Sequence, residues 1–527
     1  MFEFGISVLF ALIPGLILFL YGIEQFSKEL QASVGKYFRG ALGKVTKTPL
    51  RGLVTGTIFT SIVQSSTATT VITVSLVNAG LISFYQSLGI IFGVNIGTTV
   101  TAQLVAFKLT FFAPVLILVG FGLDLVGRKY KVFGKPIFYF GLVFFGLSLM
   151  SDAVAPLRTD PAIVSLLTSF SFIPLGILAG FILTNVFQSS SVVTGILVVL
   201  AANGLVGLGQ ALPIIFGADI GTTTTALIAS YKMNVFAKRA AVAHFLFNVL
   251  GVLIFLPFVA LYISFISGLG GSPAQQVANA QTIFKVIIAF IFIIFISQFR
   301  ALVERIIPSK EKEILLKSEY LEKLPEGKSE LFDAIQNELM NSLSVSLRIF
   351  DSTTASLKGK DNSQQVTRLE ELANFLHEKI TSACLVLSKK NLSDEEVERV
   401  VLLSRTSDLV EQVSNMGSNL GAVASQLKEQ DYVLSKESLR GLDEVYGLLR
   451  KNLVILVEEF PKLSNKSIAG FRKNEGLLRE RITVNYEIYL ERLSKDSDKT
   501  AGTAFGQALA MLQDSEEKVR EVRKLFN

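Results

Sequence analysis

A polar run, Gln64-Ser65-Ser66-Thr67, recurs 124 positions later as Gln188-Ser189-Ser190-Ser191, each time inside a long apolar stretch. The surrounding segments, 52–108 and 176–232, align without a gap and share 26 of 57 residues. The chain therefore contains an internal duplication. Polar clusters that interrupt apolar segments at matching places in two halves are typical of membrane carriers, whose sites are built from broken helices.

A second motif keeps the same spacing: Gly93-Val94-Asn95-Ile96-Gly97-Thr98-Thr99 returns as Gly217-Ala218-Asp219-Ile220-Gly221-Thr222-Thr223. These glycines are compatible with ordinary helix packing, but Gly-Thr-Thr after Asn or Asp also favours a broken span with exposed carbonyls, and we favour the second interpretation. Asp219 is ionisable, whereas the first copy has a neutral Asn95 at this position. An ionisable residue inside a membrane indicates a functional site and is expected to pair with another polar group.

Lys285 is a second ionisable residue, which we place at the start of the last span. Its alternative role is that of a lysine whose head group reaches the outer membrane interface.

Hydropathy divides the chain in two, because long apolar segments fill residues 6–300 and charges concentrate in the rest, with a mean hydropathy of +0.50 overall. Five segments are long enough, or nearly so, to cross a hydrocarbon core of about 30 Å: 4–26, 111–126, 135–150, 240–262 and 284–299. The 52–80 and 176–204 segments are broken at their centres and predict hairpins that enter the membrane and return. We expect the apolar run from Ile6 to stay as an uncleaved first span, because no basic residue precedes it and no cleavage site is evident.

We predict an all-α fold: a polytopic membrane protein of two inverted-topology repeats with re-entrant hairpins, followed by a cytoplasmic helical bundle. The expected divisions are 1–135 for the first repeat, 136–305 for the second repeat with the last span, and 306–527 for the bundle. The only cysteine, Cys384, precludes an intramolecular disulfide, and two distant histidines do not suggest a zinc centre. No phosphate-binding loop, nucleophile–base pair or metal cluster indicates an enzyme.

Basic residues favour one side of the membrane if the repeats insert in opposite senses. Thirteen lie in loops that would then share the inner side, and only Lys108 and Arg158 lie outside. We therefore expect an outer N-terminus and a cytoplasmic C-terminal region in a plasma or inner membrane, and we attribute the net charge of +6 to lipid headgroups and not to nucleic acid. The inner residues are Lys28, Lys36, Arg39, Lys44, Lys47, Arg51, Arg128, Lys129, Lys131, Lys135, Lys232, Lys238 and Arg239.

A glutamine beside hydroxyl residues, at a point where two half-helices meet, supplies donors, acceptors and helix N-termini without a fixed charge. This combination suits an oxyanion together with a small cation such as Na⁺, which prefers oxygen ligands. The alternative is that these serines and threonines only join helices, as they often do in membranes. Two such clusters at equivalent positions of the duplicated segments favour the binding site over helix joining.

On these motifs the chain, over residues 10–300, resembles the type II sodium/phosphate cotransporter family, which carries paired Gln-Ser-Ser and Gly-x-Asn-Ile-Gly-Thr motifs on inverted repeats. The resemblance implies sodium-coupled movement of inorganic phosphate. It places phosphate at the two tips, namely Gln64, Ser65, Ser66, Thr67, Gln188, Ser189, Ser190 and Ser191.

The resemblance further implies sodium binding or coupling at Asn95, Thr98, Thr99, Asp219, Thr222, Thr223, His244, Asn248 and Lys285. The chain departs from the family pattern at three places, the first of them in the phosphate set. Thr67 replaces a serine, Asp219 replaces an asparagine, and Gln281 with Lys285 replaces the His and Asn that stand four apart at His244 and Asn248. We hypothesise that Asp219 and Lys285 compensate each other, the ammonium occupying or screening a cation position.

After Arg300 apolar residues recur at helical spacing, and breaks near 358–362, 389–393, 428–435 and 494–503 predict about six helices. This region is similar to PhoU-type domains, whose Glu-x-x-x-Asp metal motifs fit best at Glu370 and Glu411. Both have Asn in place of the Asp, at Asn374 and Asn415, which weakens a metal site and favours solvated helix faces. We expect a regulatory or docking domain.

The favoured function is a secondary transporter of phosphate, coupled to sodium, that alternates access around a midplane site; it needs no cofactor. The alternative is a membrane-tethered phosphate sensor with a non-transporting carrier core. Expected partners are phosphate, sodium, lipid, and either a second copy of the chain or a cytoplasmic protein that binds the PhoU-like domain.

Overall fold

The structure, a computed structural model, describes residues 2–45, 48–107, 109–126, 128–309, 313–360, 362–432, 434–495 and 499–526. Side chains are described for these residues except 2–9, 34–45, 109, 128–131, 491–495 and 499–501. Lys47 and Lys108, and the side chains of Lys36, Arg39, Lys44, Arg128, Lys129 and Lys131, all used in the charge argument, thus lie outside the described residues.

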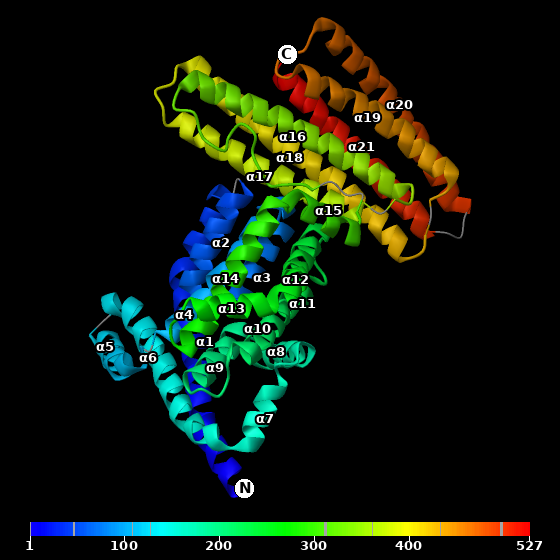
Figure 1. Cartoon of the computed structure of the whole chain (residues 1–527). Helices are drawn as coiled ribbons and strands as arrows, with labels where there is room; N and C mark the ends of the chain where they lie inside the picture. The colour runs from blue at the N-terminus through cyan, green and yellow to red at the C-terminus, as the bar shows by residue number, and fades with distance from the viewer. Residues whose placement is uncertain are drawn as a thin grey trace. The chain divides into compact units, whose positions relative to one another are not determined.

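The described residues form helices and no strand, which confirms the all-α fold class (Figure 1). The chain divides into two compact units, Met1–Lys310 and Glu311–Asn527. The first unit contains α1 (Phe2–Val45), α2 (Pro49–Val63), α3 (Ser66–Asn78), α4 (Phe84–Ala106), α5 (Ala113–Leu125), α6 (Arg128–Val154), α7 (Pro161–Ser169), α8 (Ile173–Phe187), α9 (Ser190–Ala202), α10 (Leu208–Gly221), α11 (Thr224–Ser230), α12 (Val235–Phe255), α13 (Val259–Gly268), α14 (Pro273–Ile294) and α15 (Ile296–Ile306).

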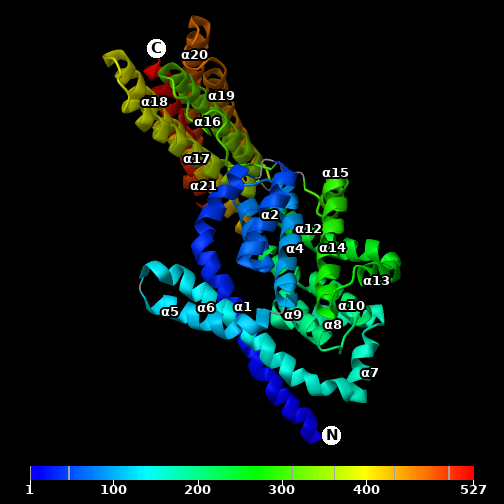
Figure 2. The same ribbon diagram turned by 60° about the vertical axis from the view of Figure 1, so that its left-hand side comes forward.

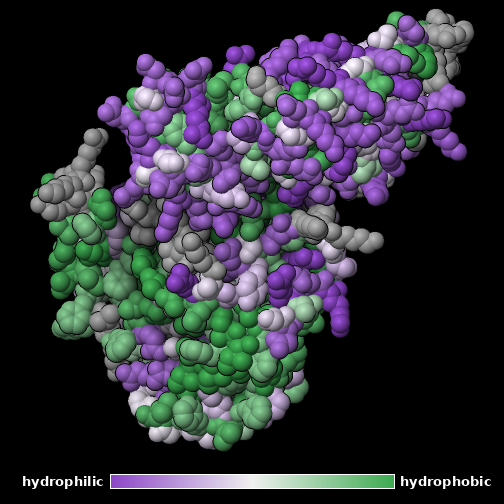
Figure 3. All heavy atoms as spheres, turned by 90° about the horizontal axis from the view of Figure 1, so that it is seen from above, coloured by the Kyte–Doolittle hydropathy of each residue, from purple (hydrophilic) through white to green (hydrophobic). Residues whose placement is uncertain are grey.

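Six segments of the described chain are long and apolar enough to cross a membrane: Phe10–Ser33, Phe84–Ala106, Val132–Thr159, Leu208–Ser230, Val235–Gly268 and Pro273–Ile294. Large apolar side chains such as Phe10, Phe111 and Leu261 are exposed on this unit. Hydrophobic residues also gather on one part of the molecular surface and hydrophilic residues on another (Figure 3). Such an apolar surface is stable in lipid and not in water.

Three sequence predictions about the spans need correction. The 84–106 and 208–230 segments are candidate spans that the prediction omitted, and 111–126 lies in a shorter apolar helical stretch, Thr110–Leu125. The last span begins at Pro273, eleven residues before the predicted start at Phe284. Its first turns are polar, and they begin a helix because Ser272 and Gln275 cap each other's backbone N–H groups.

The duplicated segments fold alike. Helices α2 and α3 meet at Gln64, as α8 and α9 meet at Gln188, so the predicted central breaks are confirmed. Gly80 and Gly204, at equivalent positions, both adopt a left-handed φ, of 68° and 69°. The Gly-Thr-Thr motif breaks the helix only in the second copy, between α10 and α11, whereas α4 continues through Gly97 to Ala106. The expected break in the first copy is therefore wrong.

Glycines let helices of each repeat touch at their backbones. A Cβ atom on Gly93 of α4 would lie 2.0 Å from the Leu53 carbonyl oxygen of α2, and one on Gly217 of α10 would lie 1.9 Å from the Ile177 oxygen of α8. These are the same positions in the two copies. Each half-helix before a glutamine is thus fixed against a long helix of its own repeat.

The second unit consists of α16 (Lys328–Leu357), α17 (Ser363–Ser388), α18 (Asp394–Glu429), α19 (Lys436–Glu459), α20 (Asn465–Lys495) and α21 (Lys499–Leu525) (Figure 2). The predicted breaks at 358–362, 389–393 and 428–435 are confirmed, and residues 496–498 of the fourth lie outside the described chain. One further break, between α19 and α20, was missed. The buried core contains Leu339 of α16, Val410 of α18, Leu453 of α19 and Leu509 of α21.

Glu516 of α21 is only 4 % exposed, and its Oε1 atom has no hydrogen-bond partner among the described residues. Burial, and to a lesser degree the Glu475 carboxylate, raises the pKa of Glu516 to about 7.

The first prediction concerns helix contact. Gly217→Ala should destabilise the first unit by about 1–3 kcal/mol or more, because the new methyl group forces α10 away from α8, and should lower the midpoint of thermal unfolding in detergent. Gly209→Ala, in the same helix with nothing within 4 Å of the added Cβ, should leave the midpoint unchanged or slightly raised. Equal midpoints for the two variants would contradict the backbone contact.

The second prediction concerns pH. Folding holds the Glu516 proton to a higher pH than the unfolded chain does, so the free energy of unfolding of this unit should fall as the pH rises from about 4.5 to about 7. Glu516→Gln should remove this loss and slow hydrogen exchange in α21 at pH 8 relative to the wild-type chain at the same pH. Glu517→Gln, at the exposed neighbour, is the control. Faster exchange in Glu516→Gln would show that the buried carboxylate stabilises the helix.

Candidate functional site

The first tip turns at Gln64, which ends α2 with φ 57° and ψ 26°. Ser65 is then extended and caps α3, its hydroxyl accepting from the Ala68 N–H at 3.2 Å. The second tip repeats this geometry. Gln188 has φ 55° and ψ 22°, and Ser189 caps α9 by accepting from the Val192 N–H at 3.4 Å.

A left-handed backbone at a residue other than glycine costs of order 1–3 kcal/mol and persists only where its surroundings hold it. Among the described residues outside glycine, φ is positive at Gln64, at Gln188 and at Asp431 in a loop of the second unit. The two glutamines therefore share a conformation that their sequence alone does not favour.

A threonine and a carbonyl hold each glutamine side chain. The Thr101 hydroxyl donates to Gln64 Oε1 at 2.6 Å, and Gln64 Nε2 donates to the Ser61 carbonyl. In the second copy the corresponding bonds are Thr225 to Gln188 Oε1, at 3.2 Å, and Gln188 Nε2 to the Asn185 carbonyl, at 2.6 Å.

These threonines were not among the predicted site residues. They were detectable, because Thr101 and Thr225 are identical at the 124-residue spacing.

The two tips differ in exposure. Gln64 is 8 % exposed, whereas Gln188 is exposed. The hydroxyl residues behind them show the reverse order, since Ser190 and Ser191 are buried while Ser66 and Thr67 are half-buried. The hydrogen bonds of each glutamine side chain go to its own repeat, so a single phosphate site formed by both tips stays a prediction.

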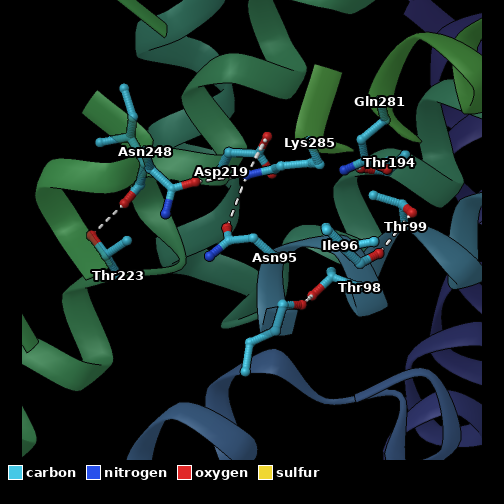
Figure 4. A network of polar contacts seen from close by, with 12 residues as sticks. Asn95, Ile96, Thr98, Thr99, Thr194, Asp219, Thr223, Asn248, Gln281 and Lys285 are labelled. Atoms are coloured by element: carbon cyan, nitrogen blue, oxygen red, sulfur yellow. Dashed lines mark hydrogen bonds and ion pairs between the residues drawn. The ribbon is translucent and has the colours of Figure 1, made fainter. Parts of the chain in front are cut away.

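Four of the predicted coupling residues meet around one buried atom, the ammonium nitrogen of Lys285 (Figure 4). This nitrogen lies 2.9 Å from Asp219 Oδ2, 3.0 Å from Asn95 Oδ1 and 2.6 Å from Asn248 Oδ1. Each of the four side chains comes from a different helix: Asn95 from α4, Asp219 from α10, Asn248 from α12 and Lys285 from α14. All four residues are at most 3 % exposed.

The position of Lys285 corrects one expectation. Lys285 lies in the middle of α14 and not at the start of the span, and it is 2 % exposed. The alternative in which its head group reaches the outer interface is therefore wrong. The partner expected for Asp219 is Lys285 itself.

The predicted threonines surround this cluster but bond locally. Thr98 donates to Val94 O, Thr99 to Ile96 O and Thr223 to Ile220 O, at 2.7–2.8 Å. A hydroxyl that donates to its own helix keeps lone pairs that accept a hydrogen bond or bind a cation. Thr222 Oγ1 is buried without a partner among the described residues, next to the break between α10 and α11.

Gln281, one turn before Lys285, donates to Thr194 Oγ1 at 3.2 Å, which joins α14 to the second tip helix. Sequence reasoning did not use Thr194, although it matches Thr70 at the 124-residue spacing. Thr70 Oγ1 and both ring nitrogens of His244 are buried without a hydrogen-bond partner in the described chain. The copies thus differ in their polar contacts as well as in their residues.

In the second unit the two predicted metal residues bond to neighbours. Glu370 accepts from the Ser418 hydroxyl, and Glu411 accepts from Asn415 at 2.6 Å. No group of three His, Cys, Asp or Glu side chains that suits a metal ion occurs among the described residues.

The fold and the site define a multi-pass helical membrane protein with a duplicated, uncharged tip motif and a buried, charge-balanced cluster. The chain belongs to the Na⁺/Pi-cotransporter family, which matches residues 18–152 and 161–297. This confirms the family resemblance. The family consists of transporters and not of enzymes, which agrees with the predicted class.

The chain is similar to several known proteins. It is 33 % identical to "Uncharacterized protein YqeW" of Bacillus subtilis over 299 residues, which are 56 % of this chain and 97 % of that one. It is 26 % identical to "Putative inorganic phosphate export protein YjbB" of Escherichia coli over 464 residues, 85 % of this chain and 84 % of that one. It is 41 % identical to "Sodium-dependent phosphate transport protein 2C" of Mus musculus over 107 residues, 19 % of this chain and 18 % of that one. No solved structure matches the chain.

The third prediction compares the two threonines. Thr101→Val should destabilise the first unit by about 1–3 kcal/mol, because it leaves the buried Gln64 oxygen without its donor. Thr225→Val should cost less than about 1 kcal/mol, because water replaces the hydroxyl at the exposed Gln188. The measurement is thermal unfolding of each purified variant in detergent. Equal losses would show that the two tips are equally buried.

Proposed function

We propose that this chain is a carrier that moves inorganic phosphate across the membrane, with the two tips as its phosphate site. One observation carries the proposal: both glutamines adopt the same disfavoured backbone conformation and use equivalent threonine and carbonyl partners. At each tip a helix begins directly after the glutamine, so backbone N–H groups and serine hydroxyls are available to an anion. The anion-binding residues are Gln64, Ser65, Ser66, Thr67, Gln188, Ser189, Ser190 and Ser191.

Alternating access requires two halves that move against each other, and the contact between α1 and α6 supports inverted repeats. In the aligned sequences Gly22 of α1 corresponds to Gly146 of α6. A Cβ on Gly15 would contact Met150, one on Gly22 would contact Val143, and one on Gly146 would contact Phe19. Residue numbers rise along α1 as they fall along α6, so two equivalent helices pack antiparallel. Repeats inserted in opposite senses produce this contact.

Sodium is the proposed coupling ion. The mouse relative is described as sodium-dependent, and oxygen atoms of the kind sodium prefers surround the cluster in α4, α10 and α12. The unpartnered Thr222 hydroxyl and the carbonyls at the break between α10 and α11 are available as ligands. The residues assigned to coupling are Asn95, Thr98, Thr99, Asp219, Thr222, Thr223, His244, Asn248 and Lys285.

The second unit is proposed to be a cytoplasmic PhoU-like domain that regulates the carrier or docks a partner, with the N-terminus of the chain outside. Loop charge supports this orientation. The Escherichia coli relative, described as a phosphate export protein, matches 85 % of this chain, which is more than the first unit alone. A coupled carrier runs in the direction in which the summed gradients of its substrates drive it. Phosphate movement is therefore measured in both directions.

The fourth prediction tests transport. Proteoliposomes with purified protein should take up labelled phosphate faster with an inward sodium gradient than with potassium in its place. Gln188→Ala should reduce this uptake by tenfold or more, about 1.4 kcal/mol of transition-state stabilisation, because one tip loses its side-chain donor and acceptor. Gln276→Ala, a glutamine of α14 away from the tips, should transport at the wild-type rate.

The outcomes separate two functions. Uptake that Gln188→Ala leaves unchanged would contradict the tip site. Phosphate binding without uptake in either direction would instead support a membrane-tethered phosphate sensor. Lys285 favours the sensor, because its ammonium connects α14 to side chains of α4, α10 and α12.

A further inference from the structure

The Lys285 ammonium is held by oxygen atoms of the protein. An ammonium group has three N–H donors and no acceptor. Three oxygen atoms lie within 3.0 Å of Nζ, one each from Asn95, Asp219 and Asn248. The Asn95 and Asn248 oxygens accept hydrogen bonds, and Asp219 Oδ2 forms an ion pair with the ammonium without a hydrogen bond. The Asp219 carboxylate already balances the charge of the ammonium, so this lysine is not arranged to bind an anion.

The same oxygens form the kind of shell that a free monovalent cation uses. Three neutral or anionic oxygens converge on one point from three helices, and Phe247 and Phe284 present their rings to that point, with centroids 6.0 Å and 5.7 Å from Nζ. An aromatic face adds to the attraction of a cation when the site is desolvated. The shell is therefore selective for positive charge whatever supplies it.

The four polar residues are two pairs of equivalent positions. Asn95 and Asp219 match at the 124-residue spacing. Segments 241–248 and 278–285 match at a spacing of 37, with Ala241, Ala243 and Phe247 repeated as Ala278, Ala280 and Phe284. Asn248 and Lys285 occupy the last position of these segments. The ammonium thus enters a symmetric oxygen shell from a position where the other copy has an amide.

We propose that the Lys285 ammonium is a tethered cation, standing in a monovalent-cation site that Asn95, Asp219 and Asn248 line. The positive charge in the site then belongs to the protein and is not transported with the substrate. The Asp219 carboxylate balances that charge. In a carrier, which rests on the proposed function, this lowers the number of co-transported cations by one per cycle. The occupancy of the site itself does not depend on transport.

An ion pair that only stabilises the fold is the main alternative, and it makes a different prediction. Removing the ammonium from a buried pair leaves an uncompensated carboxylate, which is strongly unfavourable. A purely structural site stays empty and the protein is damaged. A cation site recruits a free ion, because the oxygen shell and the carboxylate remain.

The fifth prediction is a gain of binding. Purified Lys285→Asn protein in detergent should bind one more radiolabelled sodium ion per chain than the wild-type protein at saturation, because the shorter amide leaves room next to Asp219. The double variant Lys285→Asn, Asp219→Asn should lose this additional ion, since the carboxylate that attracts it is gone. Thermal unfolding should show the same order, with sodium in place of choline raising the midpoint of Lys285→Asn by more than that of either other protein.

Two results would overturn the proposal. The first is a Lys285→Asn protein that is monodisperse and binds no more sodium than the wild-type protein. The second is a Lys285→Asn protein that fails to fold in sodium and in choline alike while the double variant folds, because the carboxylate then recruits no free cation. Sodium binding is measured without phosphate or a membrane, so the result stands whether or not the chain transports phosphate.

Discussion

A polar group within the apolar interior of a membrane protein has no water to bond, so the protein must supply its partner. Gln64 and the Lys285 cluster of the first unit meet this constraint, whereas Thr70, Thr222 and His244 keep buried atoms without a partner among the described residues. Each tip glutamine sits where a helix stops, and its side-chain amide is used at both ends, by a threonine hydroxyl and by a backbone carbonyl. The buried lysine has three protein oxygens within 3.0 Å, two that accept hydrogen bonds and one that forms an ion pair.

These hydrogen bonds form only where the helices lie close together. Gly93 and Gly217 allow α4 and α10 to touch the backbones of α2 and α8, which brings Thr101 and Thr225 within reach of the glutamines at the ends of those helices. A side chain at either glycine would separate the helices and lengthen the hydrogen bonds that follow. The motif glycines are therefore explained by packing, and the site depends on that packing.

Signals that are local or repeated predicted much of the fold. The breaks at Gln64 and Gln188 were evident because polar residues interrupted two aligned apolar segments, and three loops of the second unit were evident from breaks in helical periodicity. The missed loop after α19 had a local signal in Pro461. The division at the Gly-Thr-Thr motifs was not predictable from the motif alone. Thr224 follows this motif in the second copy, making a run of β-branched hydroxyl residues that favours a break, whereas Val100 follows it in α4.

The environment of Lys285 depended on tertiary contacts. The polar stretch before it resembles a loop, yet it is helical because neighbours bond its side chains, with Gln281 on Thr194 and Asn279 on Gln103. Sequence periodicity does not contain these contacts. The helix start had a local signal in the capping pair Ser272 and Gln275, which was missed, so Lys285 was placed at the start of the span with the interface as its alternative.

Duplication gives two equal halves, but a carrier that binds a cation asymmetrically needs the halves to differ. The aligned copies differ at 31 of 57 positions, and a few of these differences meet in space. Asn95 against Asp219, Asn248 against Lys285 and His244 against Gln281 are all substitutions between equivalent positions, and the first two pairs meet at one ammonium. The tips, by contrast, keep the same backbone and the same partners while differing in exposure. Two pairs of differing residues thus meet at one ammonium, while the backbone geometry of the tips is retained. An ammonium paired with a carboxylate leaves the net charge of this buried cluster at zero, which lowers the cost of placing two ionisable groups inside a membrane.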